Sequence, residues 1–133
     1  MNKAEIEAVM QAHPDLTIVG MFHWPGKHTS EERAAQKAEW RARMLTPYAL
    51  AQYERAKQYI QQLQPSVKPY LLSSSYGLKH RAESWHRQRG TEDPYVSNGM
   101  VIAAAIAAGY RICRVDGPNI FINVAASSVK DAA

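Results

Sequence analysis

The side chains most capable of chemistry are concentrated in one stretch, SSSYGLKHRAESWHRQRG, which covers residues 73–90. It holds four lysine or arginine side chains, two histidines and one carboxylate, that of Glu83. At about 100° per residue, the apolar Leu78, Ala82 and Trp85 fall on one side of a helix. The spacing therefore predicts an amphipathic helix with a basic outer face that holds Lys79, His80, Glu83, His86 and Arg87.

Such a face can neutralise phosphates, and Gln88 or His86 can reach a base edge. Two arginines in the predicted C-terminal hairpin extend the positive surface, and the amino end of the helix at 97–108 offers N–H groups to an anion. The competing interpretation is that Glu83 pairs with Lys79 and Arg87, which leaves an ordinary solvated surface. The predicted nucleic-acid contacts are Lys79, His80, Arg81, His86, Arg87, Arg89, Ser97, Asn98, Arg111 and Arg114.

The histidines do not predict a metal site, and we expect neither a metal nor a cofactor. His80 and His86 flank Glu83, but they lie about 9 Å apart along a helix axis, which is too far for one metal to bind both. His23 and His28 flank WPGK without a nearby carboxylate or cysteine to complete a site.

No catalytic signature stands out either. Cys113 lies on a predicted strand between Ile112 and Arg114, so we expect its thiol to be packed rather than reactive. The sequence has no glycine-rich phosphate loop followed by lysine and serine or threonine, and no G-x-S-x-G motif. We therefore do not expect an enzyme.

The composition is that of a soluble globular domain, with 46% hydrophobic and 21% charged residues among 133. A formal net charge of +4 favours anionic partners. The single cysteine excludes an intrachain disulfide and fits a reducing cytoplasm. The N-terminus does not read as a secretory signal, and the longest apolar run, 100–108, is too short to span a bilayer. A cytoplasmic location is expected.

Hydrophobic spacing and capping residues predict one α+β domain over residues 1–133, mostly helical, with a small antiparallel sheet. Thr29, Thr46, Ser75 and Ser97 are the expected helix caps, and Gly109 is expected to end the last long helix. The loop at 65–75 is a candidate subdomain seam, and residues 125–133 are expected to be frayed. Helices are predicted at 3–12, 30–45, 47–63, 75–89 and 97–108, a strand at 16–22 and a hairpin at 110–124.

The order of the last elements, a basic helix, a short link, an apolar helix and a hairpin, is that in which a winged helix-turn-helix ends. In such domains the second helix presents polar side chains to the major groove. Here residues 100–108 offer methyl groups instead. Contacts with DNA would therefore have to come from the basic helix, the amino end of the apolar helix and the hairpin.

The second half of the chain also carries a recurring motif, YGLKH with a downstream glutamate, then YVSNG, an alanine-rich run and GY, then NIFINV. Over residues 76–124 it resembles a family of short, poorly characterised proteins carried by bacterial prophages, phages and plasmids. The resemblance implies a mobile-element accessory protein. Such proteins tend to be small DNA-binding regulators or inhibitors of host defence, for example anti-CRISPR proteins.

Aromatic residues give the remaining signal. Trp85 and Tyr53 are expected in the core, and Tyr76 and Tyr95 are expected to fix the direction of the chain where the last two long helices begin. Any of three other aromatic side chains would mark a protein interface if exposed, because such anchors dominate binding energy. These candidates are Trp24, Trp40 and Tyr70.

Two functions follow from these features. The leading hypothesis is a non-enzymatic accessory protein that binds nucleic acid through the basic helix and the hairpin. The alternative is a protein-binding inhibitor or adaptor that acts on a nucleic-acid-handling complex. Either could form a homodimer on a tryptophan patch. The discriminating feature is whether the cationic side chains converge on one surface.

Overall fold

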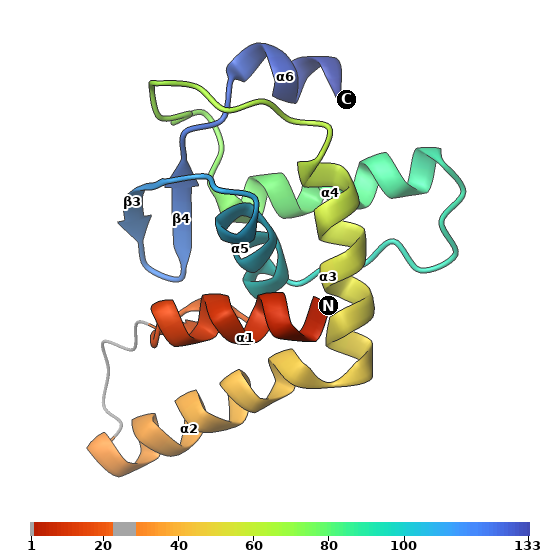
Figure 1. Cartoon of the computed structure of the whole chain (residues 1–133). Helices are drawn as coiled ribbons and strands as arrows, with labels where there is room; N and C mark the ends of the chain where they lie inside the picture. The colour runs from red at the N-terminus through yellow and green to blue at the C-terminus, as the bar shows by residue number, and fades with distance from the viewer. Residues whose placement is uncertain (1, 23–28) are drawn as a thin grey trace.

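The computed structural model describes residues 2–22 and 29–133. It is a mostly helical α+β domain, as predicted, and its helices surround a central one (Figure 1). None of the helices in these ranges is both long and apolar enough to cross a membrane. The helices are α1 (Asn2–Ala12), α2 (Ser30–Ala42) with a 3-10 turn η1 (Arg43–Leu45), α3 (Pro47–Ile60), α4 (Ser75–Gln88), α5 (Asn98–Ala107) and α6 (Ala126–Asp131). The strands are β1 (Leu16–Thr17), β2 (Gly20–Met21), β3 (Ile112–Asp116) and β4 (Asn119–Ile122).

Three of the four predicted helix caps are confirmed. Thr29 Oγ1 accepts from the Glu32 N–H at 3.1 Å, and Thr46 and Ser97 cap α3 and α5 in the same way. These caps satisfy N–H groups that a helix leaves without partners. The prediction for Ser75 is wrong, because Ser74 is the N-cap residue and Ser75 is the first residue of α4. The Ser75 hydroxyl instead accepts from the Ile120 N–H at 3.1 Å, which ties α4 to β4.

The alanine-rich helix α5 lies in the middle of the molecule, in contact with α1, α3 and α4 (Figure 1). Met100, Ile102 and Ala103 have no exposed surface. Its small side chains let the surrounding helices approach closely, and Gly109 ends the helix with φ +93°. Because α5 is enclosed, it is not available to enter a DNA groove as the second helix of a winged helix-turn-helix would.

Residues 16–22 were expected to form one strand, and this is wrong. They form a tight hairpin in which β1 pairs antiparallel with β2. Thr17 Oγ1 donates to the Gly20 carbonyl at 2.8 Å, and Gly20 has φ +121°, which a side chain would disfavour. The hairpin does not join β3–β4 in one sheet: the two pairs are separate sheets. They are linked by a hydrogen bond from the Met21 N–H to the Pro118 carbonyl at 2.8 Å.

The C-terminal hairpin is confirmed, with β3 and β4 antiparallel around a turn at Gly117. The predicted loop at 65–75 runs beside the end of β4. Ser66 N–H donates to the Asn123 carbonyl at 2.7 Å, and Tyr70 N–H donates to the Ile122 carbonyl at 3.0 Å. The loop is therefore fastened to the hairpin by backbone hydrogen bonds.

The prediction of a frayed tail at 125–133 is wrong, because α6 forms there and packs its apolar side chain inward. Val129 is buried, and Ser128 Oγ accepts from the Gln64 N–H at 3.0 Å. Ser128 also donates to the Ala125 carbonyl at 2.7 Å. This serine thereby connects α6 to the segment that follows α3.

Candidate nucleic-acid interface

The helix α4 carries most of the predicted contacts, but it is rotated relative to the expectation from the sequence. Lys79, Glu83 and His86 were expected on the outer face, yet their exposed fractions are only 8%, 5% and 2%. They share the buried side of the helix with Ser75, Leu78 and Ala82. Trp85 was expected in the core and is only half-buried. Part of the helix face that was predicted to be exposed is therefore buried against the rest of the protein.

Lys79 and Glu83 form an ion pair inside the protein, with 2.7 Å between Lys79 Nζ and Glu83 Oε2. The Val96 N–H donates to the same carboxylate at 3.4 Å, and His80 Nδ1 lies 3.1 Å from its other oxygen. Burial by itself raises the pKa of Glu83, but the hydrogen bond and the positive charge of Lys79 outweigh it, so this pKa lies below its ordinary value.

The ammonium group of Lys79 also lies between two tyrosine rings. Its Nζ is 5.7 Å from the centroid of Tyr76 and 4.7 Å from that of Tyr95, which are cation–π distances. These two tyrosines belong to the YGLKH and YVSNG parts of the sequence motif. The two tyrosines of the motif therefore pack around the Lys79 ammonium, whose charge is balanced by Glu83. Little of the Lys79 side chain remains exposed for a phosphate to contact.

His86 is likewise occupied by internal contacts. Its Nε2 lies 2.8 Å from the Arg55 carbonyl, which can only accept, so Nε2 carries the hydrogen. Its Nδ1 lies 2.8 Å from Thr91 Oγ1. His86 therefore holds α4 to α3 and to the link that follows, and it does not face a partner.

The residues that do face outward on α4 are polar or basic. Arg81 and Arg87 are exposed, and no carboxylate of the described residues lies within ion-pair distance of either. Arg89 lies 3.8 Å over the Trp85 ring. Since Glu83 is the one acidic residue of α4 and points inward, the outward face carries no negative charge. Besides Tyr76, the exposed residues of α4 are His80, Arg81, Ser84, Arg87 and Gln88, and the exposed Arg89 follows at the C-cap.

The amino end of α5 is enclosed, contrary to its predicted role. Ser97 and Asn98 are each 5% exposed. The Gly99 N–H donates to the Ile18 carbonyl at 3.1 Å, and the Met100 N–H donates to Ser97 Oγ at 3.4 Å. These N–H groups are therefore already paired and are not available to a phosphate.

The side chain of Asn98 links the two hairpins. Its Nδ2 lies 3.2 Å from the Val19 carbonyl, 3.3 Å from the Pro118 carbonyl and 3.0 Å from Asn119 Oδ1. Gly99 permits the close approach, because a Cβ there would lie 2.0 Å from the Thr17 carbonyl oxygen. Close packing between the start of α5 and the two hairpins therefore accounts for the SNG part of the motif.

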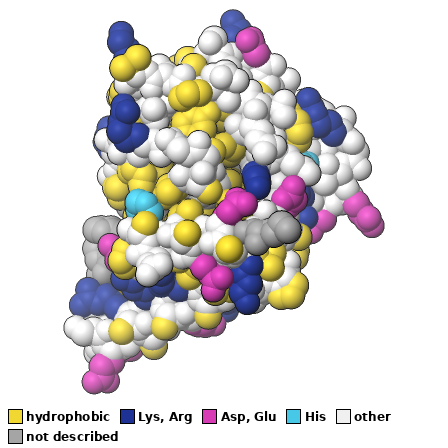
Figure 2. Space-filling view, viewed as in Figure 1, with side chains coloured by type: hydrophobic (Ala, Val, Ile, Leu, Met, Phe, Trp, Pro, Cys, Tyr) yellow, Lys and Arg dark blue, Asp and Glu magenta, His cyan; other side chains and the backbone are white. Residues whose placement is uncertain are grey.

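The hairpin arginines are exposed but already have contacts. Arg111 donates from its guanidinium to the Val67 carbonyl at 3.1 Å. Arg114 lies 5.5 Å over the Phe121 ring. Both keep their charge, so they can still attract an anion. On the side of the molecule shown in Figure 2, Lys and Arg occur in several separate places among acidic and hydrophobic side chains.

The three predicted interface aromatics do not form one exposed patch. Tyr70 is buried, and Trp40 is half-buried with its ring 6.0 Å from that of Phe22. Trp24 lies outside the described residues, as do His23 and His28. Among the residues that the structure describes, the exposed aromatic ones are instead Tyr48, Tyr76 and Tyr95, which sequence reasoning did not select as interface anchors.

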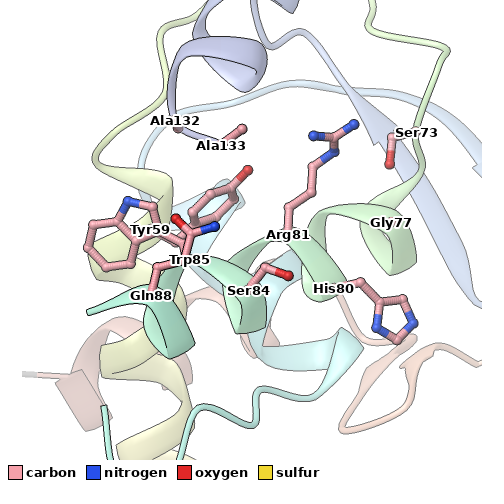
Figure 3. Close-up of a pocket in the computed structure, with 10 residues that line it drawn as sticks. All are labelled: Tyr59, Ser73, Gly77, His80, Arg81, Ser84, Trp85, Gln88, Ala132 and Ala133. Carbon is pink, nitrogen blue, oxygen red and sulfur yellow. The ribbon is translucent and has the colours of Figure 1, made fainter. Parts of the chain in front are cut away.

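A cavity of about 480 Å³ opens beside α4, and Figure 3 shows the side chains around it. Arg81, Ser84 and Gln88 come from the outward face of the helix, and Trp85 and Tyr59 form an aromatic side. Of its lining residues, Ser73, Ser84 and Tyr59 were not predicted as site residues, because nothing in the sequence indicates that 73, 84 and the end of α3 meet. Within the described ranges, no three His, Cys, Asp or Glu side chains gather as a metal would require.

Comparison of the chain with protein-family models, curated proteins and solved structures found no match. The functional argument therefore rests on the geometry of the site.

Proposed function

We propose that this protein is a non-enzymatic accessory protein that binds nucleic acid through the outward face of α4. The observation that carries the proposal is the inward position of Glu83. The only carboxylate of the helix is paired with Lys79 inside the protein, so the outward cations are not neutralised by their own helix. Nucleic-acid affinity depends chiefly on such uncompensated charges.

The proposed contact set is smaller than the set predicted from the sequence. Lys79, His86, Ser97 and Asn98 are buried and take no part in it. Arg81 and Arg87 provide the main charges. At about 100° per residue they lie about 120° apart around α4, and His80 lies beside Arg87. Arg89 follows α4 as its C-cap residue. Arg111 and Arg114 on the hairpin are secondary candidates, because they lie on a different element and already contact protein groups.

The test is fluorescence anisotropy of labelled single- and double-stranded oligonucleotides over a salt series. Each phosphate contact contributes about 0.7 to the salt slope for a single strand and about 0.9 for a duplex. We expect Arg81→Gln and Arg87→Gln each to lower affinity and to reduce the slope by about that amount. Lys3→Gln is the matched control, because it removes one exposed charge from α1 and should change affinity little.

A direct nucleic-acid function is excluded if the unaltered protein fails to bind either oligonucleotide at low salt. It is also excluded if Lys3→Gln weakens binding as much as Arg87→Gln, because the attraction would then be a property of net charge alone.

A second candidate function, binding to a protein, is favoured by the exposed apolar side chains at the motif. Two adjoining hollows of about 370 and 290 Å³ share Ile18, Val19, Tyr95 and Ser97. The two cations that line this groove, Lys79 and Arg43, are paired with Glu83 and Glu39, so the groove suits an uncharged surface better than a phosphate. The exposed apolar side chains around it are Val19, Tyr48, Tyr76 and Tyr95.

The protein-binding function would be that of an inhibitor or adaptor for a nucleic-acid-handling complex. A photo-crosslinking amino acid at position 48 should then capture a specific protein subunit in host cells. The same amino acid at position 54, on the other side of α3, is the control. Equal capture at both positions, or capture at neither, would exclude this groove as the binding surface.

A further inference from the structure

The cavity beside α4 is lined by groups that suit an anion at one end and a planar ring at the other. Figure 3 shows the Arg81 side chain extending toward the space between Ser73 and the residues after α6. The indole of Trp85 lies at the opposite side. The volume, about 480 Å³, lies within the range of small-ligand pockets.

The anionic end is defined by Arg81. Its guanidinium has five N–H donors, and none of the described carboxylates lies within ion-pair distance of it. The Ser84 hydroxyl lies on the same lining and can also donate, whereas the Ser73 hydroxyl on that lining already donates to the Ser74 carbonyl at 3.3 Å. A guanidinium with a hydroxyl on the same lining matches a phosphate group, to which arginine binds in a bidentate manner.

The other end is defined by Trp85, whose indole is held in place by three neighbours. The Arg89 guanidinium lies 3.8 Å over it, the Tyr59 ring is edge-on at 6.3 Å, and the His86 ring is edge-on at 4.9 Å. Arg89 covers one face of this indole and does not line the cavity, so a base would contact the part of the fixed ring that lines the cavity. Gln88 adds an amide that can both donate to and accept from a base edge.

We infer that this cavity binds one nucleotide unit, with its phosphate at Arg81 and its base beside Trp85 and Gln88. The inference rests on the proposed nucleic-acid function and specifies the form of nucleic acid. In a duplex the bases are stacked and paired inside the helix, so a base can enter the cavity only from a single strand or from a free nucleotide. The protein therefore prefers single strands to duplexes.

The position of Ser84 allows a direct test. Its side chain is exposed and lines the cavity, so Ser84→Phe fills the space without changing charge and without disturbing the core. Gln11→Phe on α1 is the matched control, because it adds the same ring at an exposed position outside this cavity. Circular dichroism before and after heating verifies that both variants fold like the parent protein.

Binding is measured by anisotropy with a labelled single strand of about 12 nucleotides, a hairpin duplex of the same sequence, and a labelled adenosine monophosphate. We expect the single strand to bind about tenfold more tightly than the duplex, and Ser84→Phe to remove that preference. Gln11→Phe should preserve it. Arg81→Gln should weaken the single strand and the free nucleotide together.

The outcomes separate the inference from the function on which it rests. If oligonucleotides bind but Ser84→Phe behaves like Gln11→Phe, the cavity is not a nucleotide site, although the proposed function stands. If only the free nucleotide binds, and Ser84→Phe abolishes its binding, the cavity is a nucleotide site and the proposed function is wrong. If the protein binds neither the oligonucleotides nor the free nucleotide, the proposed function and the inferred nucleotide site are both wrong.

Discussion

Lys79 and Glu83, one turn apart on α4, form their 2.7 Å ion pair inside the protein and not on its surface. The pair has two consequences. It places a lysine between Tyr76 and Tyr95, and it removes the only negative charge from the outward side of the helix. The packing around α4 and the proposed nucleic-acid binding therefore both depend on the Lys79–Glu83 pair.

Loss of one partner of this pair should destabilise the protein strongly. Glu83→Gln leaves the buried Lys79 ammonium without its counter-charge, and breaking such a pair costs about 3 kcal/mol or more. The double variant Lys79→Met/Glu83→Leu removes both charges and should recover most of the loss. Urea denaturation measures both. Equal stability of Glu83→Gln and the parent protein would show that the pair is effectively solvated.

The same carboxylate should make stability depend on pH. The pKa of Glu83 in the folded protein is below the ordinary value of 4.5, so its contribution is complete above the unfolded pKa and is lost as pH falls through the folded pKa. We expect the urea midpoint to fall when pH is lowered below about 4.5. Glu83→Gln should show a smaller fall over the same range, and an identical fall would assign the effect to other carboxylates.

Gly99 should not tolerate a side chain. In Gly99→Ala the new Cβ would clash with the Thr17 carbonyl oxygen and the Ile18 backbone. Both are main-chain groups, which cannot shift aside as the end of a flexible side chain can. Overpacking of this kind costs about 3 kcal/mol. Gly109→Ala is the comparison, because it meets nothing within 4 Å and bears only the strain of φ +93°. Thermal unfolding should show Gly99→Ala as the less stable of the two.

The C-terminal helix α6 should contribute measurably to stability. Ser128→Ala removes the acceptor of the Gln64 N–H, which should cost about 1–2 kcal/mol. Its neighbour Ser127 is exposed, so Ser127→Ala is a matched control that should change stability little. If the two variants unfold at the same urea concentration, α6 is not held to the fold by Ser128.

The sequence predicted the long helices well because their signals are local. Thr29, Thr46 and Ser97 each cap a helix from within four residues of the groups that they bond. The hairpin at 16–22 was missed because its β-forming residues indicate a strand without marking the turn. Thr17 and Gly20 close that turn, and Asn98, which lies far along the chain, adds a hydrogen bond to the Val19 carbonyl. A helix at 126–131 was missed because its short sequence gains order only where Val129 reaches the core.

The candidate site was predicted only in part, and the orientation of α4 explains why. Lys79 and Glu83 were assigned to the outer face because the helical angles place them opposite an apolar side that includes Trp85, yet Trp85 is only half-buried. Their burial depends on Tyr95 and Val96, which no helical spacing connects to α4. The exposed Arg81 and Arg87 could be selected from charge alone, whereas the cavity beside them requires Tyr59 and Ser73 from other segments.

The carboxamide of Asn98 joins Val19, 79 residues earlier, to Pro118 and Asn119, 20 and 21 residues later. The fold is therefore closed by contacts between distant parts of the chain. A ribosome that has released only the first hundred residues has released neither Pro118 nor its hairpin. We expect the N-terminal helices to complete their packing only after this hairpin has emerged. Until then the apolar α5 segment of the growing chain is exposed and prone to aggregation.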